Sequence, residues 1–322
     1  MNEKFAAVRP YLNNDDQLCR ARLSRLEEGG GRGQRVIDVT NGSGLAFTIT
    51  PDRGMNIVDC SFCGIPISFW SPSGHRWVSG NWLRDWSAGL FTTCGLQNAG
   101  NPSGGHGLHG DISSECAEQL SINCRGGEAQ ITGLIHEGTI FSANLTLDRK
   151  ISTAYGSNVI DVEDTVTNCG ENTIFTEMLY HCNLGYPLVS PDLEFVAVDH
   201  EIVPRDEAAK QDLANWNSYP EPLEGFGEYC YRHIIPATDG NWANMALVNR
   251  KIGIKLTVAY DTTGLPHMIQ WKKPSKYGYV LGMEPANVSL AGCEFDRENG
   301  FGKFLAPMEQ AHYHFRLVFE KI

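Results

Sequence analysis

The feature that most constrains the fold is a long series of short β-prone runs, each separated from the next by turn residues. The series begins with residues 35–39 and 45–50, which flank Asn41-Gly42, a strong hairpin signal. The series does not alternate with helices in the βαβ manner, which argues against a parallel doubly wound sheet. The pattern predicts an all-β protein, a large antiparallel sandwich or barrel, as a single domain over residues 1–322. The other runs of strand length are 55–62, 65–70, 130–137, 139–148, 158–167, 173–181, 242–249, 252–260, 268–271, 279–283 and 312–320.

Only two segments carry a helical pattern. In an N-terminal extension, residues 1–32, the acidic pair at 15–16 can cap a helix that the triple glycine at 29–31 would end. Residues 205–217 predict a second short helix. The segment 100–110 is the least strand-like part of the chain, and we expect a functional loop there. The apolar residues of the first predicted helix recur loosely on one face, at Leu18, Leu23 and Leu26.

The charge balance narrows the set of partners. The chain has 26 Lys and Arg against 38 Asp and Glu, a formal net charge of −12, and its basic residues cluster only at Lys272-Lys273. Nucleic acids and anionic membrane surfaces both require a basic patch, so neither is an expected partner. No stretch approaches the roughly 18 apolar residues of a membrane span, and residues 1–10 lack the apolar core of a secretory signal. We therefore expect a cytoplasmic protein with a small neutral substrate.

Ten cysteines raise the question of disulfides or a metal. Without an export signal a disulfide framework is not expected, and most of the thiols lie in apolar runs where they pack as small hydrophobes. Cys60 and Cys63 form the only C-x-x-C pair, and no second pair at zinc-binding spacing accompanies it. His312 and His314 lie two residues apart on one strand face. Two ligands do not make a metal site, so a structural role is favoured for them. The sequence predicts neither a metal nor a cofactor.

Three side chains are candidates for acid–base chemistry. His109 lies among glycines in the run 104–110, which would leave its imidazole accessible, although a histidine in a surface turn fits as well. His181 ends an apolar run and can donate a proton near neutral pH; a strand-end histidine satisfied by the backbone is the alternative. Glu284 also ends an apolar run, where burial would raise its pKa and suit a general base, or where it would form a structural salt bridge.

Two arginines are weaker candidates for ligand contacts. Arg53 lies in a turn, where an ion pair with Asp52 would explain it equally well. Arg84 lies between Trp82 and Trp86. An arginine beside two indole rings can grip the hydroxyls of a sugar that stacks on those rings, although aromatic residues are more often part of the core.

Taken in order, these residues resemble the aldose 1-epimerase superfamily, the galactose mutarotase-like proteins. The likeness covers the chain from about residue 33 to its end and is closest to a divergent bacterial branch with little assigned function. In that branch, runs such as 51–55 and 93–98 are typical. The resemblance implies a β-supersandwich with its site in a groove on one concave sheet. The motifs that carry it are Arg84, Leu108-His109-Gly110, His181 followed by Asn183-Leu184, and Met283-Glu284-Pro285.

The resemblance also implies roles for individual residues. Glu284 would be the general base that takes the proton from the anomeric hydroxyl. His181 would be the general acid that protonates the ring oxygen, so that the ring opens and closes again on the other face. His109 and Arg84 would hold sugar hydroxyls, with Asn98 as a further contact.

The sequence departs from the family pattern at one sugar-binding position. Family members carry an Asp between the catalytic histidine and glutamate, and here Glu228 is the candidate; Arg53 is a further candidate contact in this branch. The predicted function is a cofactor-independent carbohydrate epimerase of the aldose 1-epimerase type. A related isomerase or lyase of a keto sugar or uronate stays open, as does a non-catalytic carbohydrate-binding protein. Pairing of edge strands in a homodimer also stays open.

Overall fold

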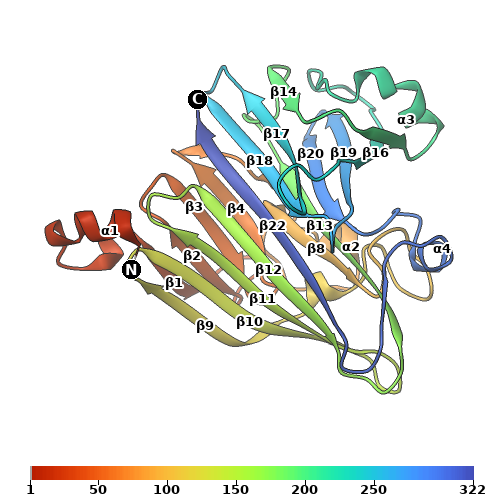
Figure 1. Cartoon of the computed structure of the whole chain (residues 1–322), viewed down its shortest axis with the longest axis horizontal. Coiled ribbons are helices and arrows are strands. Elements are labelled where there is room, and N and C mark those ends of the chain that lie inside the picture. Colours follow the sequence, from red (N-terminus) through yellow and green to blue (C-terminus); the bar gives the residue numbers. More distant parts are fainter. Residues whose placement is uncertain (1) are drawn as a thin grey trace.

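The computed structural model describes residues 2–322, and two large antiparallel sheets hold nearly all of the strands (Figure 1). The fold is therefore the antiparallel β-sandwich that the strand-like runs predict. The order of the twelve-stranded sheet is β1 (Arg20–Arg25), β2 (Arg35–Thr40), β3 (Leu45–Thr50), β4 (Asn56–Phe62), β8 (Phe91–Leu96), β13 (Ile174–Leu184), β20 (Gly278–Ala286), β19 (His267–Ser275), β16 (Tyr229–Ile234) and β15 (Glu201–Pro204), with β5 (Ile65–Pro66) beside β4 and β21 (Lys303–Leu305) beside β13.

The second sheet has eight strands, and a small third sheet pairs β6 (Phe69–Trp70) with β7 (Ala88–Gly89). The run predicted at 65–70 is thus split between two sheets, because β5 pairs with β4 and β6 does not. The order of the eight-stranded sheet is β14 (Leu193–Val196), β17 (Trp242–Asn249), β18 (Ile254–Asp261), β22 (Gln310–Lys321), β12 (Val159–Asn168), β11 (Asn144–Ala154), β10 (Glu128–Gly138) and β9 (Ala117–Arg125).

The apolar faces of the two large sheets pack against each other and form the core. Every second residue of β10 is buried, among them Ala129, Ile131 and Ile135, and the residues between them are more exposed. This is expected for a strand with one face in a core. Across the two sheets, the rings of Phe91 and Phe315 meet edge to face with their centroids 5.3 Å apart. The period-two pattern of the sequence therefore corresponds to this interface.

Helices are few and short: α1 (Glu3–Val8), α2 (Trp82–Asp85), α3 (Glu207–Gln211) and α4 (Cys293–Glu298). Within residues 2–322, no helix has the length and apolar character that crossing a membrane requires. The second predicted helix, at 205–217, is confirmed as α3 followed by a 3₁₀ turn at Leu213–Asn215.

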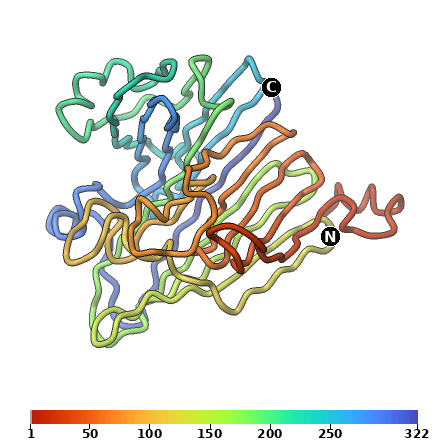
Figure 2. The backbone as a smooth tube through the Cα atoms, turned by 180° about the vertical axis from the view of Figure 1, so that it is seen from behind, coloured from red at the N-terminus to blue at the C-terminus, as the bar shows by residue number. Residues whose placement is uncertain are grey.

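The predicted N-terminal helix is wrong. Its centre forms β1, which pairs antiparallel with β2 from Arg20–Thr40 to Arg25–Arg35. The helical extension expected over 1–32 is reduced to α1 and two 3₁₀ turns. Leu23 is 49% exposed, so the leucines bury no continuous helical face, whereas the open edge of β2 offers a full ladder of hydrogen bonds. Seen from behind, the segment that contains α1 projects from this edge of the sandwich (Figure 2).

A buried ionic network ties the middle of the two sheets together. Arg149 on β11 is fully buried and forms an ion pair with Asp164 on β12. From the opposite sheet, the hydroxyl of Tyr180 on β13 donates to Asp164 at 2.6 Å, and Arg149 Nη1 donates to Thr93 Oγ1 on β8 at 2.8 Å. A buried pair is tolerated where further hydrogen bonds satisfy it, and these bonds come from both sheets. They fix the position of β13 relative to the eight-stranded sheet.

Candidate active site

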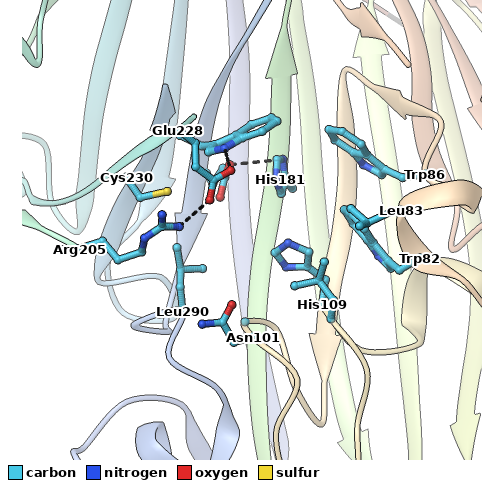
Figure 3. Close-up of a pocket in the computed structure, with 14 residues that line it drawn as sticks. Trp82, Leu83, Trp86, Asn101, His109, His181, Arg205, Glu228, Cys230 and Leu290 are labelled. Carbon is cyan, nitrogen blue, oxygen red and sulfur yellow. Dashed lines mark hydrogen bonds and ion pairs between the residues drawn. The ribbon is translucent and has the colours of Figure 1, made fainter. Parts of the chain in front are cut away.

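Two strands at the middle of the twelve-stranded sheet supply the central pair of the site. The antiparallel register of β13 and β20 pairs Leu179 with Ala286 and Asn183 with Gly282, so His181 and Glu284 lie opposite each other between these pairs. Because side chains alternate along a strand, His181 faces the pocket while its neighbour Tyr180 faces the core. His181 Nδ1 lies 3.3 Å from Glu284 Oε1 (Figure 3).

Burial favours the uncharged form of both groups. It raises the pKa of Glu284 well above its usual range, with a further increase from the charge of Glu228. Burial, together with a smaller contribution from His109, lowers the pKa of His181 to about 3. His181 Nδ1 and Glu284 Oε1 are both buried without another partner, and one proton placed between them would satisfy both atoms. We therefore assign a protonated carboxyl at Glu284 that faces a neutral imidazole.

Gly282 makes the position of this carboxyl possible. It lies two residues before Glu284 on the same face of β20 and pairs with Trp271 on β19. A Cβ atom at Gly282 would lie 2.2 Å from Glu284 Oε1 and 2.9 Å from Trp271 Cβ. Any side chain here would therefore displace the carboxyl.

Aromatic rings form one wall of the pocket. Trp82 and Trp86, on and just after α2, stack with centroids 5.2 Å apart and an interplanar angle of 20°. His109 lies against Trp82 at 4.6 Å, and His181 lies edge-on to both Trp86 and Trp271 at 5.4 and 5.3 Å. Such a wall offers a flat apolar surface beside His181 and Glu284.

His109 projects from the glycine-rich loop that the sequence indicated. Its Nδ1 lies 2.7 Å from the carbonyl oxygen of Ala99, and a carbonyl only accepts, so Nδ1 carries the proton and Nε2 is left as an acceptor. Burial lowers the pKa of His109 in spite of this hydrogen bond. The residue adopts φ of +61°, a strained conformation for a histidine that is common at functional sites.

The opposite wall is polar and anionic. Glu228 accepts hydrogen bonds from Trp271 Nε1 at 2.9 Å and from Arg205 Nη1 at 3.0 Å (Figure 3). Burial would raise the pKa of Glu228, but these two bonds and the positive charges of Arg205 and Lys273 together outweigh it, and the pKa is lowered. Arg205 is also ion-paired with Asp206 at 3.1 Å. The wall thus holds one cation between two carboxylates.

The pocket brings together four of the seven predicted site residues: His109, His181, Glu228 and Glu284. Its lining does not include Arg84, Arg53 or Asn98. The other residues of its lining are Trp82, Leu83, Trp86, Gly100, Asn101, Leu108, Arg205, Cys230, Trp271 and Leu290.

Arg84 and Arg53 have other surroundings. Arg84 lies on the exposed side of α2, away from the pocket lining. Arg53 is buried and donates to three backbone carbonyl oxygens, those of Ser113, Arg76 and Asp85. Arg53 thereby fixes the segment that carries α2, and it does not pair with Asp52 as the alternative reading had it.

Asn98 organises the loop behind His109. Its side-chain amide donates to the carbonyl oxygens of Asn101 and Gly107 at 3.0 and 2.9 Å, and its oxygen accepts from the backbone of Cys293. With all of these bonds made inside the protein, Asn98 shapes the loop and does not line the pocket.

Sequence reasoning missed Arg205, Asn101 and the part played by Trp271. Arg205 stood at the start of the predicted second helix, where a positive charge has no functional signature. Trp271 lay in a predicted strand as an ordinary aromatic residue. Only the pairing of β16 with β19 brings Glu228, just before β16, to the indole of Trp271.

A second group of side chains has the composition of a metal site but lies on the other sheet. Ligand atoms of Asp161, Glu163 and His314 come within 4.8 Å of one another across β12 and β22. Their carboxylates already pair with cations, Asp161 with Arg316 at 3.1 Å and Glu163 with Lys150. These ion pairs supply the positive charge that a metal would bring, which agrees with the structural role expected of His314.

Fold and pocket together define a galactose mutarotase-like β-sandwich protein, the class that includes the aldose 1-epimerases. The chain belongs to the family described as a domain of unknown function, DUF4432, whose model matches residues 31–318. Among curated proteins, none matches the chain at a significant level.

Three solved structures illustrate the likeness. A protein of Klebsiella pneumoniae, provisionally described as an aldose 1-epimerase, is 25% identical with a TM-score of 0.86, over 93% of this chain and 83% of its own. A galactose mutarotase-like protein of Clostridium acetobutylicum is 13% identical with a TM-score of 0.64, over 95% and 100%. The galactose 1-epimerase of Lactobacillus acidophilus is 12% identical with a TM-score of 0.63, over 94% and 99%. The last two support the fold alone.

Proposed function

We propose that the protein is a cofactor-independent carbohydrate epimerase of the aldose 1-epimerase type, which interconverts the two anomers of a sugar. The observation that carries the proposal is the 3.3 Å approach of Glu284 Oε1 to His181 Nδ1 in a pocket lined by aromatic rings. Ring opening removes a proton from one oxygen and delivers a proton to another. A carboxylate and an imidazolium side by side can perform both transfers.

In the proposed reaction, Glu284 takes the proton of the anomeric hydroxyl and C1 becomes an aldehyde carbon. The bond between C1 and the ring oxygen breaks, and His181 delivers a proton to that oxygen from Nε2. Rotation about the C1–C2 bond presents the other face of the aldehyde. Ring closure then reverses both transfers, so that Glu284 and His181 return to their starting forms.

The pair keeps the same number of protons through this cycle. Before ring opening Glu284 is a carboxylate and His181 an imidazolium; afterwards Glu284 is an acid and His181 a neutral imidazole. Both states have zero net charge, so the buried pocket never holds an uncompensated charge and needs no proton from solvent. Burial favours the uncharged form of each group, because it raises the pKa of Glu284 and lowers that of His181.

The other residues of the pocket could bind a sugar beside His181 and Glu284. The stacked rings of Trp82 and Trp86 offer a flat apolar surface for the C–H face of a pyranose. His109 Nε2 can accept a hydrogen bond from a hydroxyl, and Asn101 and Arg205 line the pocket where they can donate to others. A few polar groups on a largely apolar wall are the usual composition of a small-molecule site.

An uncharged sugar suits this pocket better than a uronate or a sugar phosphate. In the described part of the chain, Arg205 is the one Lys or Arg of the lining, and Glu228 and Asp206 already neutralise it. The carboxylate of a uronate or the phosphate of a sugar phosphate would lose its water beside Glu228 and Glu284, with no free cation to compensate its charge. This distribution of charge favours the epimerase over the alternative that acts on a uronate.

Anomer exchange measured by NMR tests the proposal. A panel of neutral aldoses and one uronate is compared with wild type, Glu284→Gln and His181→Asn, and Arg84→Ala serves as a control outside the pocket. We expect acceleration by wild type and by the control, and a loss of roughly 10²-fold or more in the other two, the size of one proton-transfer step. Equal acceleration by Glu284→Gln would refute the proposed base. Shifts on binding without acceleration would favour a non-catalytic sugar-binding protein.

A further inference from the structure

Two cysteines far apart in the sequence meet at one edge of the sandwich. Cys19 immediately precedes β1, the edge strand of the twelve-stranded sheet, and Cys124 lies on β9, the edge strand of the eight-stranded sheet. Their sulfur atoms are 3.6 Å apart. Both views of the chain show the N-terminal strand beside β9 (Figures 1 and 2). A disulfide has an S–S length of about 2.05 Å, so a small change of side-chain torsion would close the gap.

The surroundings of the two thiols differ in a way that assigns them different roles. Cys19 is 1% exposed, whereas Cys124 is half-buried and has the better access to a dissolved oxidant. The thiolate is the nucleophilic form of cysteine, and an accessible thiol meets the oxidant more readily than a buried one. Cys124 is therefore the thiol that reacts first, and the buried Cys19 is the thiol that resolves the intermediate.

We propose that Cys19 and Cys124 are a redox-responsive pair, which a hydroperoxide converts to a disulfide that fastens the edges of the two sheets together. In the first step the Cys124 thiolate attacks one peroxide oxygen, so that an S–O bond forms and the O–O bond breaks. The product is a sulfenic acid, and the hydroxide that leaves takes up the proton lost by the Cys124 thiol and becomes water. The Cys19 sulfur then attacks the Cys124 sulfur and breaks the S–O bond, and the sulfenic oxygen leaves with the Cys19 proton as a second water. The two thiols supply the two electrons that reduce one hydrogen peroxide to two waters.

The position of the pair predicts what the bridge changes. It would close a covalent loop between residues 19 and 124 and so restrict the unfolded chain, which stabilises the folded state. Neither cysteine lines the pocket. Oxidation should therefore raise thermal stability and leave the sugar site as it is, which separates this inference from the proposed function.

The first test is a peptide map of the protein treated with a small excess of hydrogen peroxide, alkylated and digested without reductant. We expect a disulfide-linked peptide pair that contains Cys19 and Cys124, and its loss after reduction with dithiothreitol. Cys63 and Cys116 are exposed and report whether the peroxide has acted. If these two are oxidised while Cys19 and Cys124 are recovered alkylated, the inference is overturned.

The second test is the melting temperature of the intact protein after the same peroxide treatment, before any alkylation or digestion. A bridge over a loop of this length is expected to raise Tm by roughly 5 °C or more, with reversal by dithiothreitol. Cys124→Ser should abolish the increase, and this half-buried position is a mild place for a serine. Cys63→Ser is the matched control and should keep it. An increase of the same size in Cys124→Ser would contradict the assignment.

Discussion

The indole nitrogen of Trp271 donates a 2.9 Å hydrogen bond to Oε2 of Glu228. The same ring lies 5.3 Å from the imidazole of His181. Glu228 thus holds one neighbour of His181 and Glu284 in place, while its negative charge raises the pKa of Glu284. Arg205, bound to the other oxygen of Glu228, has the opposite influence on Glu284.

This arrangement predicts opposite pH shifts for two neutral substitutions. The proposed reaction starts from a Glu284 carboxylate beside a His181 imidazolium. Activity should therefore fall at low pH, where the Glu284 carboxylate becomes protonated and can no longer act as a base. Glu228→Gln removes a negative charge and should move this acid limb of kcat/KM to lower pH, by about one unit. Arg205→Gln removes a positive charge and should move the limb to higher pH. Profiles of anomer exchange from pH 4 to 9 measure both shifts, and shifts in the same direction would contradict the assignment.

Gly282→Ala should remove activity with little loss of fold. The new methyl group would meet Glu284 Oε1 at 2.2 Å, and the carboxyl must turn away from His181. We expect a fall in kcat of roughly 10²-fold, the contribution of one proton transfer. The matched control is Gly278→Ala on the same strand, where the nearest atom to an added Cβ is 3.9 Å away. Unchanged anomer exchange in Gly282→Ala would show that this carboxyl position is not required.

Glu284→Gln should be more stable than wild type, and more so at high pH. The folded state raises the pKa of Glu284 above 4.5, so above that pH the unfolded chain releases a proton that the folded protein retains. Wild-type stability therefore falls as pH rises through this window, and glutamine does not titrate. Thermal melts at pH 5 and pH 9 should show a Tm difference that grows with pH. A difference that shrinks with pH would have the wrong sign for a raised pKa.

The two arginines of the sequence motifs should behave differently from each other. Arg84→Ala is expected to leave KM within about twofold of wild type, because Arg84 is exposed and lies outside the pocket lining. Arg53→Ala leaves three backbone carbonyls without their donor and should cost about 1–3 kcal/mol of stability. Urea unfolding and sugar-dependent rates on the same preparations distinguish the two effects. A raised KM in Arg84→Ala would return this residue to the binding site.

Much of the fold was predictable because most strands bury one face, so apolar and polar residues alternate along them in the sequence. β10 and β12 show this alternation and were predicted. β8 was missed because all six of its residues are buried, so it has no alternation, and it contains Thr92, Thr93 and Gly95. β1 was missed because it is an exposed edge strand whose stability comes from pairing with β2. A fully buried strand and an exposed edge strand both lack the alternation of apolar and polar residues by which a strand is recognised in a sequence.

The candidate site divides in a similar way. His181 and Glu284 end apolar runs, where a polar side chain is conspicuous, and the register of β13 and β20 brings them together. Asn98 also stood out, but its bonds serve the shape of a loop. Short motifs do not distinguish a residue that touches a ligand from one that holds the loop beside it. Arg205 had no signal because its role depends on Glu228, which the pairing of β15 with β16 brings beside it.

His181 and Glu284 stand on adjacent strands in the interior of a sheet, so the spacing of the backbone ladder fixes their separation. Trp271 and Cys230 of the lining also lie on strands, and most of the remaining wall comes from connecting segments: the one that carries α2, the loop at 98–110, and the one that leads from Arg205 to Glu228. Insertions and substitutions in these segments would reshape the cavity without moving the reacting atoms. Under the proposed function, such changes would alter which sugar fits the pocket and leave His181 and Glu284 in place.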